Sequence, residues 1–153
     1  MSNVSTPAAG PAPRLALVTG GGGGIGATIC QELARAGYRV VVSDVDAQRA
    51  RRVADELGAP HSAHAFDVSD ESAVETAFDQ IEQAHGPIAV LVSAAGLLLF
   101  QPNGERPLIK DTTLDIWERS FAVNARGVFL CGRAYLRRRE AAPLKHGRIV
   151  TFT

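Results

Sequence analysis

The sequence predicts an α/β protein in which a doubly wound parallel sheet lies between two layers of helices. Short apolar runs, typical of strands buried on both faces, alternate along the chain with amphipathic segments of helical spacing. Five consecutive glycines separate the first apolar run from the first amphipathic segment. Such alternation favours a parallel sheet with helices on both faces, in three α/β/α layers.

Order is expected to begin at Arg14, because residues 1–13 are rich in Pro, Ala, Ser and Gly and are typical of a disordered leader. The first strand is predicted over 15–18, where four apolar residues follow one another. The first helix is predicted over 25–36, with apolar residues three or four positions apart, and Gly37 ends it.

The middle of the chain repeats this alternation. Residues 39–43 form a second apolar run, and a helix over 47–57 follows, closed by Gly58. A short third strand is expected over 62–66. The next helix is expected over 69–85, with Ser69 as its N-cap and Ser72 as a less favoured alternative.

The fourth strand, over 88–92, is followed by a loop over 97–111 that is rich in turn residues. A long helix is expected over 113–140. Its apolar residues predict one buried face, and they are Leu114, Trp117, Phe121, Val128 and Leu136. A fifth strand begins at 148 and reaches 153. Right-handed crossovers then give a Rossmann-like sheet of strand order 3-2-1-4-5.

Composition excludes several classes of protein. Lys plus Arg and Asp plus Glu are both 16, so the chain lacks the basic excess of a nucleic-acid-binding protein. No apolar run reaches the roughly 18 residues of a membrane span, and no basic segment precedes an apolar one as in a secretory signal. A soluble cytoplasmic protein is therefore expected.

Cysteine and histidine give no sign of a metal site or a disulfide. Cys30 and Cys131 lie in predicted helices far apart in the sequence, and both are expected to be small buried apolar residues. The four histidines form no ligand pattern with them, and His61 and His64 are expected at the surface.

The most specific motif is the glycine run, which follows a strand and opens a helix as a dinucleotide fingerprint requires. Glycine permits a tight turn and lets backbone N–H groups approach a pyrophosphate, and the helix N-terminus adds partial positive charge. A merely flexible turn is the alternative, although ordering five glycines is entropically costly. No lysine follows the glycines, so a P-loop is excluded.

An acid stands where a dinucleotide-binding fold binds the adenine ribose. Asp44 comes just after the second predicted strand, 18 residues beyond Gly26. Its carboxylate would repel a 2′-phosphate, and the nearest downstream arginine is Arg49, a turn into the next helix. NAD is therefore favoured over NADP. A turn-capping role is the alternative for Asp44.

The spacing of the loop resembles that of the short-chain dehydrogenase/reductase family over residues 14–153. Thr19, Gly20, Gly24 and Gly26 give T-G-x(3)-G-x-G, with Ile25 between the last two glycines. The resemblance implies that residues 14–153 form an incomplete NAD(P)-binding Rossmann domain. It implies cofactor contacts for Thr19, Gly20, Gly22, Gly23, Gly24, Ile25 and Gly26.

Further segments are similar to family motifs. Asp67 and Val68 follow the third strand, where the family contacts the adenine; a helix-capping role is the alternative for Asp67. The fourth strand is followed by Ser93, Ala94, Ala95 and Gly96, where the family has Asn-Asn-Ala-Gly. The resemblance implies that the backbone of this loop approaches the cofactor ribose. In the family the first Asn braces the end of the strand, and Ser93 is expected to reproduce that bracing only in part.

The long helix carries a segment similar to the family's N-x-x-G-x-F. The resemblance implies that Asn124 is the catalytic-site Asn that holds an ordered water, and that Val123 contacts the cofactor. Asn is a poor helix former, so its place on the buried side of a helix needs a reason. A locally satisfied, helix-kinking residue is the alternative.

The family's catalytic Tyr and Lys, four residues apart, have no counterpart here. Tyr38 is followed at that offset by Val42, and Tyr135 by Arg139. Arg cannot tune a neighbouring pKa as Lys does, and the arginines around Tyr135 are interpreted as a solvated helix end. By the family's register, the catalytic Ser is expected one residue beyond the end of the chain. Thr153 is therefore not assigned that role.

The function predicted for the parent protein is NAD(P)-dependent oxidoreduction, by hydride transfer to or from a small-molecule alcohol or carbonyl substrate. The 153-residue chain is expected to be inactive alone, and the full-length parent is expected to be a homo-oligomer. The uncovered last strand, with Val150 and Phe152, is an expected site of association. The alternatives are a non-catalytic NAD-binding Rossmann module and, less favoured, a methyltransferase.

Overall fold

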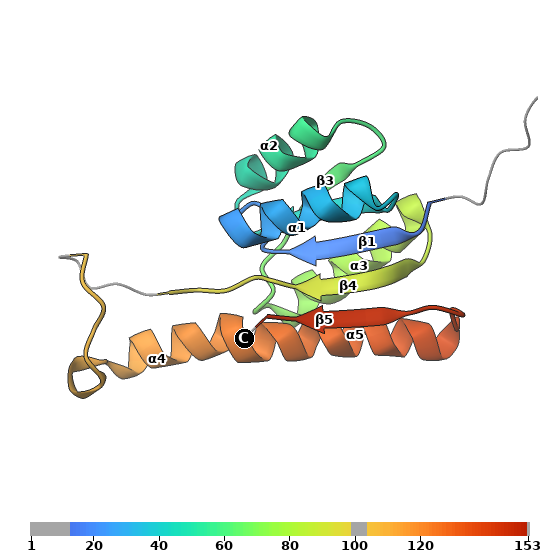
Figure 1. Cartoon of the computed structure of the whole chain (residues 1–153). Helices are drawn as coiled ribbons and strands as arrows, with labels where there is room; N and C mark the ends of the chain where they lie inside the picture. Colours follow the sequence, from blue (N-terminus) through green and yellow to red (C-terminus); the bar gives the residue numbers. More distant parts are fainter. Residues whose placement is uncertain (1–12, 99–103, 153) are drawn as a thin grey trace, which may run out of the picture.

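The computed structural model describes residues 13–98 and 104–152. Five parallel strands form one sheet in the order β3-β2-β1-β4-β5, which confirms the predicted strand order (Figure 1). The strands are β1 (Leu15–Thr19), β2 (Arg39–Asp44), β3 (Ser62–Ala65), β4 (Ile88–Ser93) and β5 (Arg148–Thr151). The α-helices are α1 (Gly24–Arg35), α2 (Ala47–Leu57), α3 (Glu71–His85), α4 (Leu114–Phe121) and α5 (Val128–Ala141).

The helices cover both faces of the sheet, as the fold class requires. On one face, α1 and α2 cover small and β-branched residues such as Val18, Val42 and Val92. On the other face, α3 and α5 cover larger ones such as Leu17 and Leu91. Successive strand residues point to opposite faces, so the continuous apolar runs seen in the sequence supply both cores.

Helix α3 begins later than the sequence predicts. Its N-cap is Asp70, whose Oδ1 accepts hydrogen bonds from the backbone N–H groups of Ser72 and Ala73 at 2.8 and 3.1 Å. The prediction of Ser69 as N-cap is therefore wrong. Asp67 and Asp70 form the same local turn in succession, and only the second leads into helical backbone.

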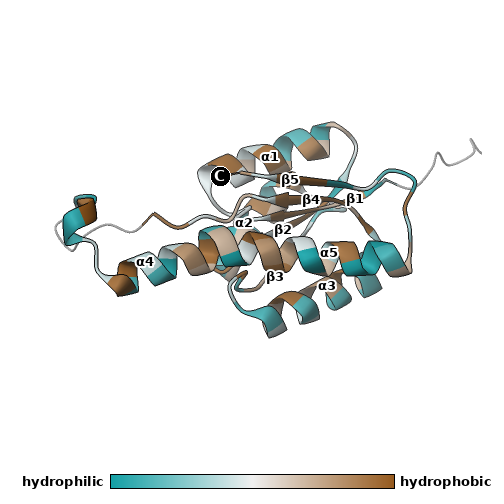
Figure 2. Cartoon of the chain, turned by 90° about the horizontal axis from the view of Figure 1, so that it is seen from below, coloured by the Kyte–Doolittle hydropathy of each residue, from teal (hydrophilic) through white to brown (hydrophobic). Residues whose placement is uncertain are grey.

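The long predicted helix is interrupted by a π-helical segment, η2 (Ala122–Gly127), between α4 and α5. In Figures 1 and 2, α4 extends beyond the edge of the sheet. The prediction of one buried apolar face is wrong for most of its members: Leu114, Trp117, Phe121 and Leu136 are exposed, and Val128 is half-buried. Periodicity identifies an apolar face but not what covers it.

The arginines of α5 are not a solvated helix end, as the sequence interpretation had it. Arg133 and Arg138 pair with acidic residues of the neighbouring helix α3, and the side chain of Arg139 is only 10% exposed. Its Nη2 lies 2.5 Å from Glu82 Oε1, which also accepts a hydrogen bond from the backbone N–H of Ile88. These arginines hold α5 against α3 and against the start of β4.

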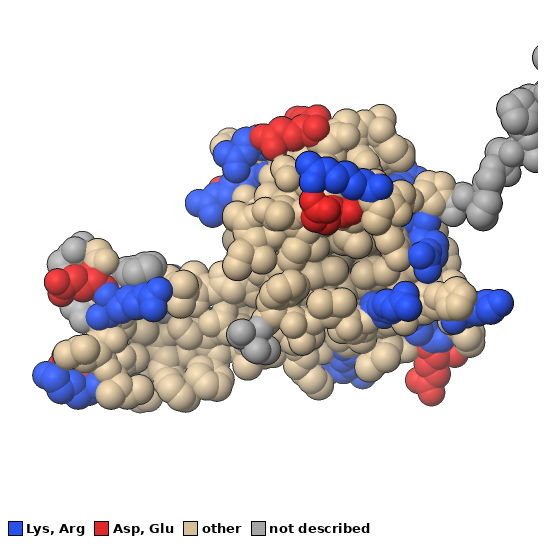
Figure 3. Space-filling model, viewed as in Figure 1, with Lys and Arg blue, Asp and Glu red and all other residues tan. Residues whose placement is uncertain are grey.

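Strand β5 pairs with β4, and its residues Ile149 and Val150 are exposed, as is Phe152 beyond it. In Figure 3 the charged atoms lie mainly around the margins of the visible face, and uncharged atoms occupy its centre. Cys30 and Cys131 are buried and free, as predicted. Within the described residues, no helix has both the length and the apolar character that a membrane crossing requires.

Candidate functional site at the carboxyl edge of the sheet

The glycine loop leaves the end of β1, turns sharply and enters α1. Gly20 has φ +68°, a left-handed conformation that side chains disfavour, and a Cβ there would lie 2.6 Å from the Ala95 backbone. A Cβ on Gly26 would lie 2.1 Å from the Gly20 carbonyl oxygen. Helix α1 can therefore touch the turn only because both positions are glycine.

The N-terminus of α1 is open to an anion. Its N-cap is Gly23, which offers no side chain, and its first turn contains no acidic residue. The first amides of a helix have no helical partner and carry partial positive charge. Gly24 is exposed, and a Cβ built on it meets no atom within 4 Å. The loop therefore fits the approach of a pyrophosphate group.

The carboxylate of Asp44, at the end of β2, faces this loop. Its Oδ2 accepts a hydrogen bond from Gly22 N at 3.2 Å, and its Oδ1 accepts one from Asp46 N at 3.1 Å. Asp44 is half-buried, and its carboxylate both closes the turn after β2 and lies beside the glycine loop.

Sequence reasoning missed how near Arg49 comes to this acid. A Cβ on Gly22 would lie 2.6 Å from Arg49 Cβ and 2.9 Å from Asp44 Oδ2. The first turn of α2 thus brings Arg49 back against the loop, although four residues separate it from Asp44 in the sequence. Arg49 Nε lies 3.4 Å from Asp46 Oδ2, so Arg49 forms an ion pair with a second acid of this corner.

Asp67 and Val68 follow β3 at the same edge. Asp67 is exposed, and its Oδ1 accepts hydrogen bonds from Ser69 N and Ser69 Oγ at 2.8 and 2.7 Å. Val68 is buried against Gly127, where an added Cβ would lie 2.7 Å from Val68 Cγ2. Asp67 thus supports a local turn, and Val68 fixes the distance between this turn and η2.

The end of β4 is braced by Thr19 rather than by Ser93. Ser93 is buried, and its Oγ has no hydrogen-bond partner among the described atoms. Thr19 O accepts a hydrogen bond from Ala94 N at 3.2 Å, and Thr19 Oγ1 accepts one from Ala95 N at 3.4 Å. The backbone of the loop therefore stays beside Gly20 without the two Asn side chains of the family motif.

Asn124 clamps the continuation of this loop. Its Oδ1 accepts a hydrogen bond from Leu97 N at 2.7 Å, and its Nδ2 donates one to Leu97 O at 3.1 Å. Asn124 is exposed, which corrects its expected place on the buried side of the helix. It lies in η2, and Val123 beside it packs against the core. π-helical turns are often found at functional sites.

The candidate residues thus come from the ends of four strands, from α1 and from η2, and they meet at one edge of the sheet (Figure 1). The strand order reverses between β1 and β4, and the crevice beyond such a reversal is where open parallel sheets bind ligands.

Both tyrosines lie at the opposite edge. Tyr38 precedes β2, and its hydroxyl accepts a hydrogen bond from Arg14 Nη2 at 2.9 Å. Tyr135 is buried, and its hydroxyl donates to Ala89 O, near the start of β4, at 3.2 Å. Desolvation raises the pKa of Tyr135, so its proton is held more firmly than usual.

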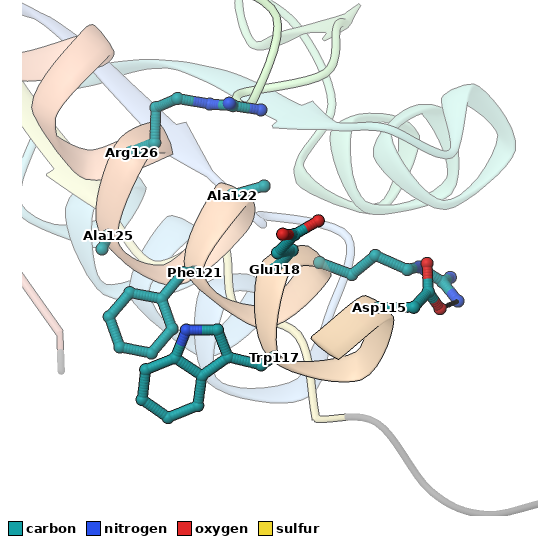
Figure 4. A pocket seen from close by; sticks show the side chains of 8 residues that line it. Asp115, Trp117, Glu118, Phe121, Ala122, Ala125 and Arg126 are labelled. Carbon is teal, nitrogen blue, oxygen red and sulfur yellow. Dashed lines mark ion pairs between the residues drawn. The ribbon is translucent and has the colours of Figure 1, made fainter. Parts of the chain in front are cut away.

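Two further candidate regions do not add to this site. A hollow of about 520 Å³ is lined by residues 115–126 of α4 and η2, and no other part of the described chain closes it (Figure 4). Trp117 and Phe121 stack along it, with ring centroids 4.2 Å apart. The loop after β4 carries two apolar side chains that a substrate could meet: Leu98 is exposed, and Phe100 lies outside the described residues. Among the residues that the structure describes, no cluster of His, Cys, Asp and Glu could hold a metal ion.

Comparisons with known proteins show the family of the chain. Residues 14–153 match the profile of the short chain dehydrogenase family. D-threitol dehydrogenase of Mycolicibacterium smegmatis is 36% identical over 124 residues, which are 79% of this chain and 45% of that protein. Secoisolariciresinol dehydrogenase of Forsythia intermedia is 33% identical over 139 residues, 90% of this chain and 48% of that protein.

A solved structure of a gluconate 5-dehydrogenase from Burkholderia cenocepacia, in complex with NADP and tartrate, superposes with a TM-score of 0.77. It is 33% identical, and the match covers 90% of this chain and 52% of that one. The chain therefore spans about half the length of the relatives it matches. From its glycine loop to its fifth strand, it belongs to the short-chain dehydrogenase family of oxidoreductases.

Proposed function

We propose that this chain is the dinucleotide-binding part of an NAD-dependent oxidoreductase. In the whole protein, hydride would pass between the nicotinamide and a small alcohol or carbonyl substrate. The observation that carries the proposal is the uncapped N-terminus of α1, which faces a glycine turn with the Asp44 carboxylate beside it. When bound, the cofactor supplies the hydride chemistry, and the protein supplies position and electrostatics.

Each part of the edge has one role in this proposal. The amides of the loop and of the first turn of α1 hold the pyrophosphate. Asp44 accepts hydrogen bonds from the adenine-ribose hydroxyls. Asp67 and Val68 bind the adenine, and the backbone of residues 94–96 orients the nicotinamide ribose. Thr19 and Asn124 act as positioning residues, since they hold the two ends of that backbone segment.

The preference for NAD over NADP follows from charge. A 2′-phosphate on the adenine ribose would face Asp44, and a pair of unit charges about 4 Å apart repels by about 4 kcal/mol at an effective dielectric near 20. Arg49 is the nearby cation, but its guanidinium is 3.4 Å from the Asp46 carboxylate. Two acids and one arginine leave this corner with a net negative charge.

The chain on its own is proposed to bind the dinucleotide without turnover. A general acid or base must lie within hydrogen-bonding reach of the reacting oxygen. Tyr38 and Tyr135 lie at the amino edge of the sheet, and the hydroxyl of Tyr135 is buried on Ala89 O. A non-catalytic dinucleotide-binding module is therefore the second candidate for the chain, favoured by this placement of its tyrosines.

The test is calorimetric titration of the wild-type chain with NAD and with NADP, beside Asp44→Asn. The amide of this variant keeps an oxygen for Gly22 N but loses the charge. We expect the wild type to bind NAD more tightly, and Asp44→Asn to lower the NAD-to-NADP affinity ratio by about tenfold or more. Asp46→Asn, which removes a charge two residues away, should change the ratio less. Tighter binding of NADP by the wild type would contradict the preference.

Turnover is measured in the same preparation. Reduction of NAD with a panel of alcohols should not exceed the blank. A rate above the blank, removed by Asp44→Ala, would show that the chain is active alone and would refute the non-catalytic interpretation.

A further inference from the structure

Three half-buried histidines lie on or beside the edge strand β3, and two of them, His61 and His85, lie at the end of the sheet opposite the glycine loop. They are His61 and His64, on either side of Ser62, and His85, the last residue of α3. His61 and His64, predicted at the surface, are partly exposed there. Strand β3 is at the edge of the sheet, and in the described chain it pairs with β2 alone.

His61 supplies a hydrogen bond that backbone would otherwise supply. Its Nδ1 accepts from the backbone N–H of Val40 at 3.1 Å, just before the β2–β3 pairing begins at Val41 and Ser62. Its own backbone N–H donates to Gly58 O at 3.0 Å, so the preceding turn fixes its position. An imidazole nitrogen accepts only when it carries no proton. Protonation at Nδ1 would place two donors face to face and leave the buried Val40 N–H without an acceptor.

The surroundings also oppose a charge on this ring. Arg39, the residue before Val40, donates through Nε to Pro60 O at 3.1 Å, and it forms no ion pair within the described chain. From β3 and α3, the facing groups are His64 and His85. Glu82, one turn before His85, already forms an ion pair with Arg139 and accepts a hydrogen bond from Ile88 N. Desolvation, and then the charge of Arg39, lower the pKa of His61; desolvation lowers the pKa of His64, and desolvation, Arg39 and His64 together lower that of His85.

We propose that His61 is a proton-sensitive latch, which holds the edge strand β3 on the sheet while its Nδ1 is unprotonated and releases it in mild acid. Beyond β3 the chain continues into Phe66, which is buried, and Val68, which packs against η2. Release of the latch therefore loosens the segment that leads to one wall of the carboxyl edge. The proposal does not depend on which cofactor that edge binds.

The sign of the pH effect follows from proton linkage. A histidine whose folded pKa lies below its unfolded value of about 6.5 takes up a proton on unfolding in acid. Its contribution to stability is complete above about pH 6.5 and is lost as the pH falls below that value. Each such histidine lowers the folding equilibrium constant by up to about tenfold per pH unit until the folded pKa is reached.

The test is urea unfolding of the full chain at pH values from 7.5 to 5, with His61→Asn beside the wild type. The amide oxygen of Asn stands in for Nδ1 as acceptor for Val40 N and does not titrate in this range. As the pH falls, the folding constant of the wild type should decrease by up to tenfold more per pH unit than the folding constant of the variant. His146→Asn, a change at an exposed histidine of the loop before β5, is the control and should keep the wild-type slope.

An NMR titration of the wild type decides the matter even where His61→Asn folds poorly. The ring of His61 should titrate below about pH 6.5, with the Val40 amide shifting in the same step. A His61 ring that titrates at or above about pH 6.5, or an unchanged pH slope in a folded His61→Asn, would overturn the proposal.

Discussion

A methyl group on Gly26 tests whether α1 must touch the glycine turn. The added Cβ would lie 2.1 Å from the Gly20 carbonyl oxygen and 2.7 Å from the Gly20 carbonyl carbon. Both are backbone atoms, which cannot move aside by a change of rotamer. The cost lies at the upper end of the roughly 1–3 kcal/mol typical of overpacking. A glycine replaced by alanine in a helix regains about 1 kcal/mol, so we expect Gly26→Ala to lose about 2 kcal/mol net.

Two other glycines provide matched controls. A Cβ on Gly132, inside α5, meets no atom within 4 Å, so Gly132→Ala should gain about 1 kcal/mol from helix propensity alone. A Cβ on Gly24 also meets nothing, but it would stand where the pyrophosphate is proposed to approach. Gly24→Ala should therefore keep the stability of the wild type and weaken NAD binding by about tenfold, the equivalent of one charge-assisted hydrogen bond.

Thermal unfolding followed by circular dichroism measures the first two changes, and calorimetry measures the third. At about 4 °C per kcal/mol for a domain of this size, Gly26→Ala should lower Tm by about 8 °C, and Gly132→Ala should raise it by about 4 °C. The reasoning would be refuted if Gly26→Ala unfolded at the wild-type temperature while Gly132→Ala was stabilised.

Three further predictions concern the helices. Asp70→Ala should lower Tm by roughly 2–6 °C and Ser69→Ala by less than about 1 °C, because Asp70 caps α3. The Ser72 hydroxyl and then the backbone lower the pKa of Asp70, so the stabilisation by this cap should be full above about pH 4 and fade in stronger acid. Equal losses of Tm in the two variants would contradict the capping assignment. Arg139→Ala should lose about 3 kcal/mol in urea unfolding against less than about 1 kcal/mol for Arg137→Ala, whose side chain is 61% exposed; similar losses would mean that burial does not govern these pairs. Burial raises the pKa of both cysteine thiols to about 12, so neither should react with iodoacetamide at pH 8 until urea unfolds the chain, and rapid reaction of the native chain would contradict their burial.

The strands and most helix ends could be predicted because local signals fix them. Gly58 and Gly86 follow α2 and α3 with φ near +74° and +86°, as glycines that end helices commonly do. Continuous apolar runs identify strands that helices cover on both faces, and right-handed crossovers between such strands predict the strand order. The start of α3 could not be fixed in this way, since Asp67 and Asp70 make the same local turn.

The arrangement of the candidate site was predictable only in part. The sequence places Thr19, Asp44 and Asn124 at the ends of strands or in a helix, but their partners depend on how elements pack. Asn124, which clamps Leu97, lies in a π-helical turn that no periodicity in the sequence indicates. The approach of Arg49 to the glycine loop depends likewise on the angle at which α2 leaves β2.

The apolar face of α4 and α5 shows a different limit. The spacing of Trp117, Phe121 and Leu136 fits a helix with one covered face, yet these side chains are exposed in the described chain. Helical periodicity reports which residues share a face, whereas burial depends on which other element lies against it.

The most direct measurement of the central claim is an NMR titration of the isotope-labelled chain with NAD. Binding at the carboxyl edge should shift the amides of residues 20–26, 68 and 94–97 most strongly. The amides near Tyr38 and His61, at the amino edge, should move little. A folded chain whose carboxyl-edge amides stay unchanged at millimolar NAD would contradict the account.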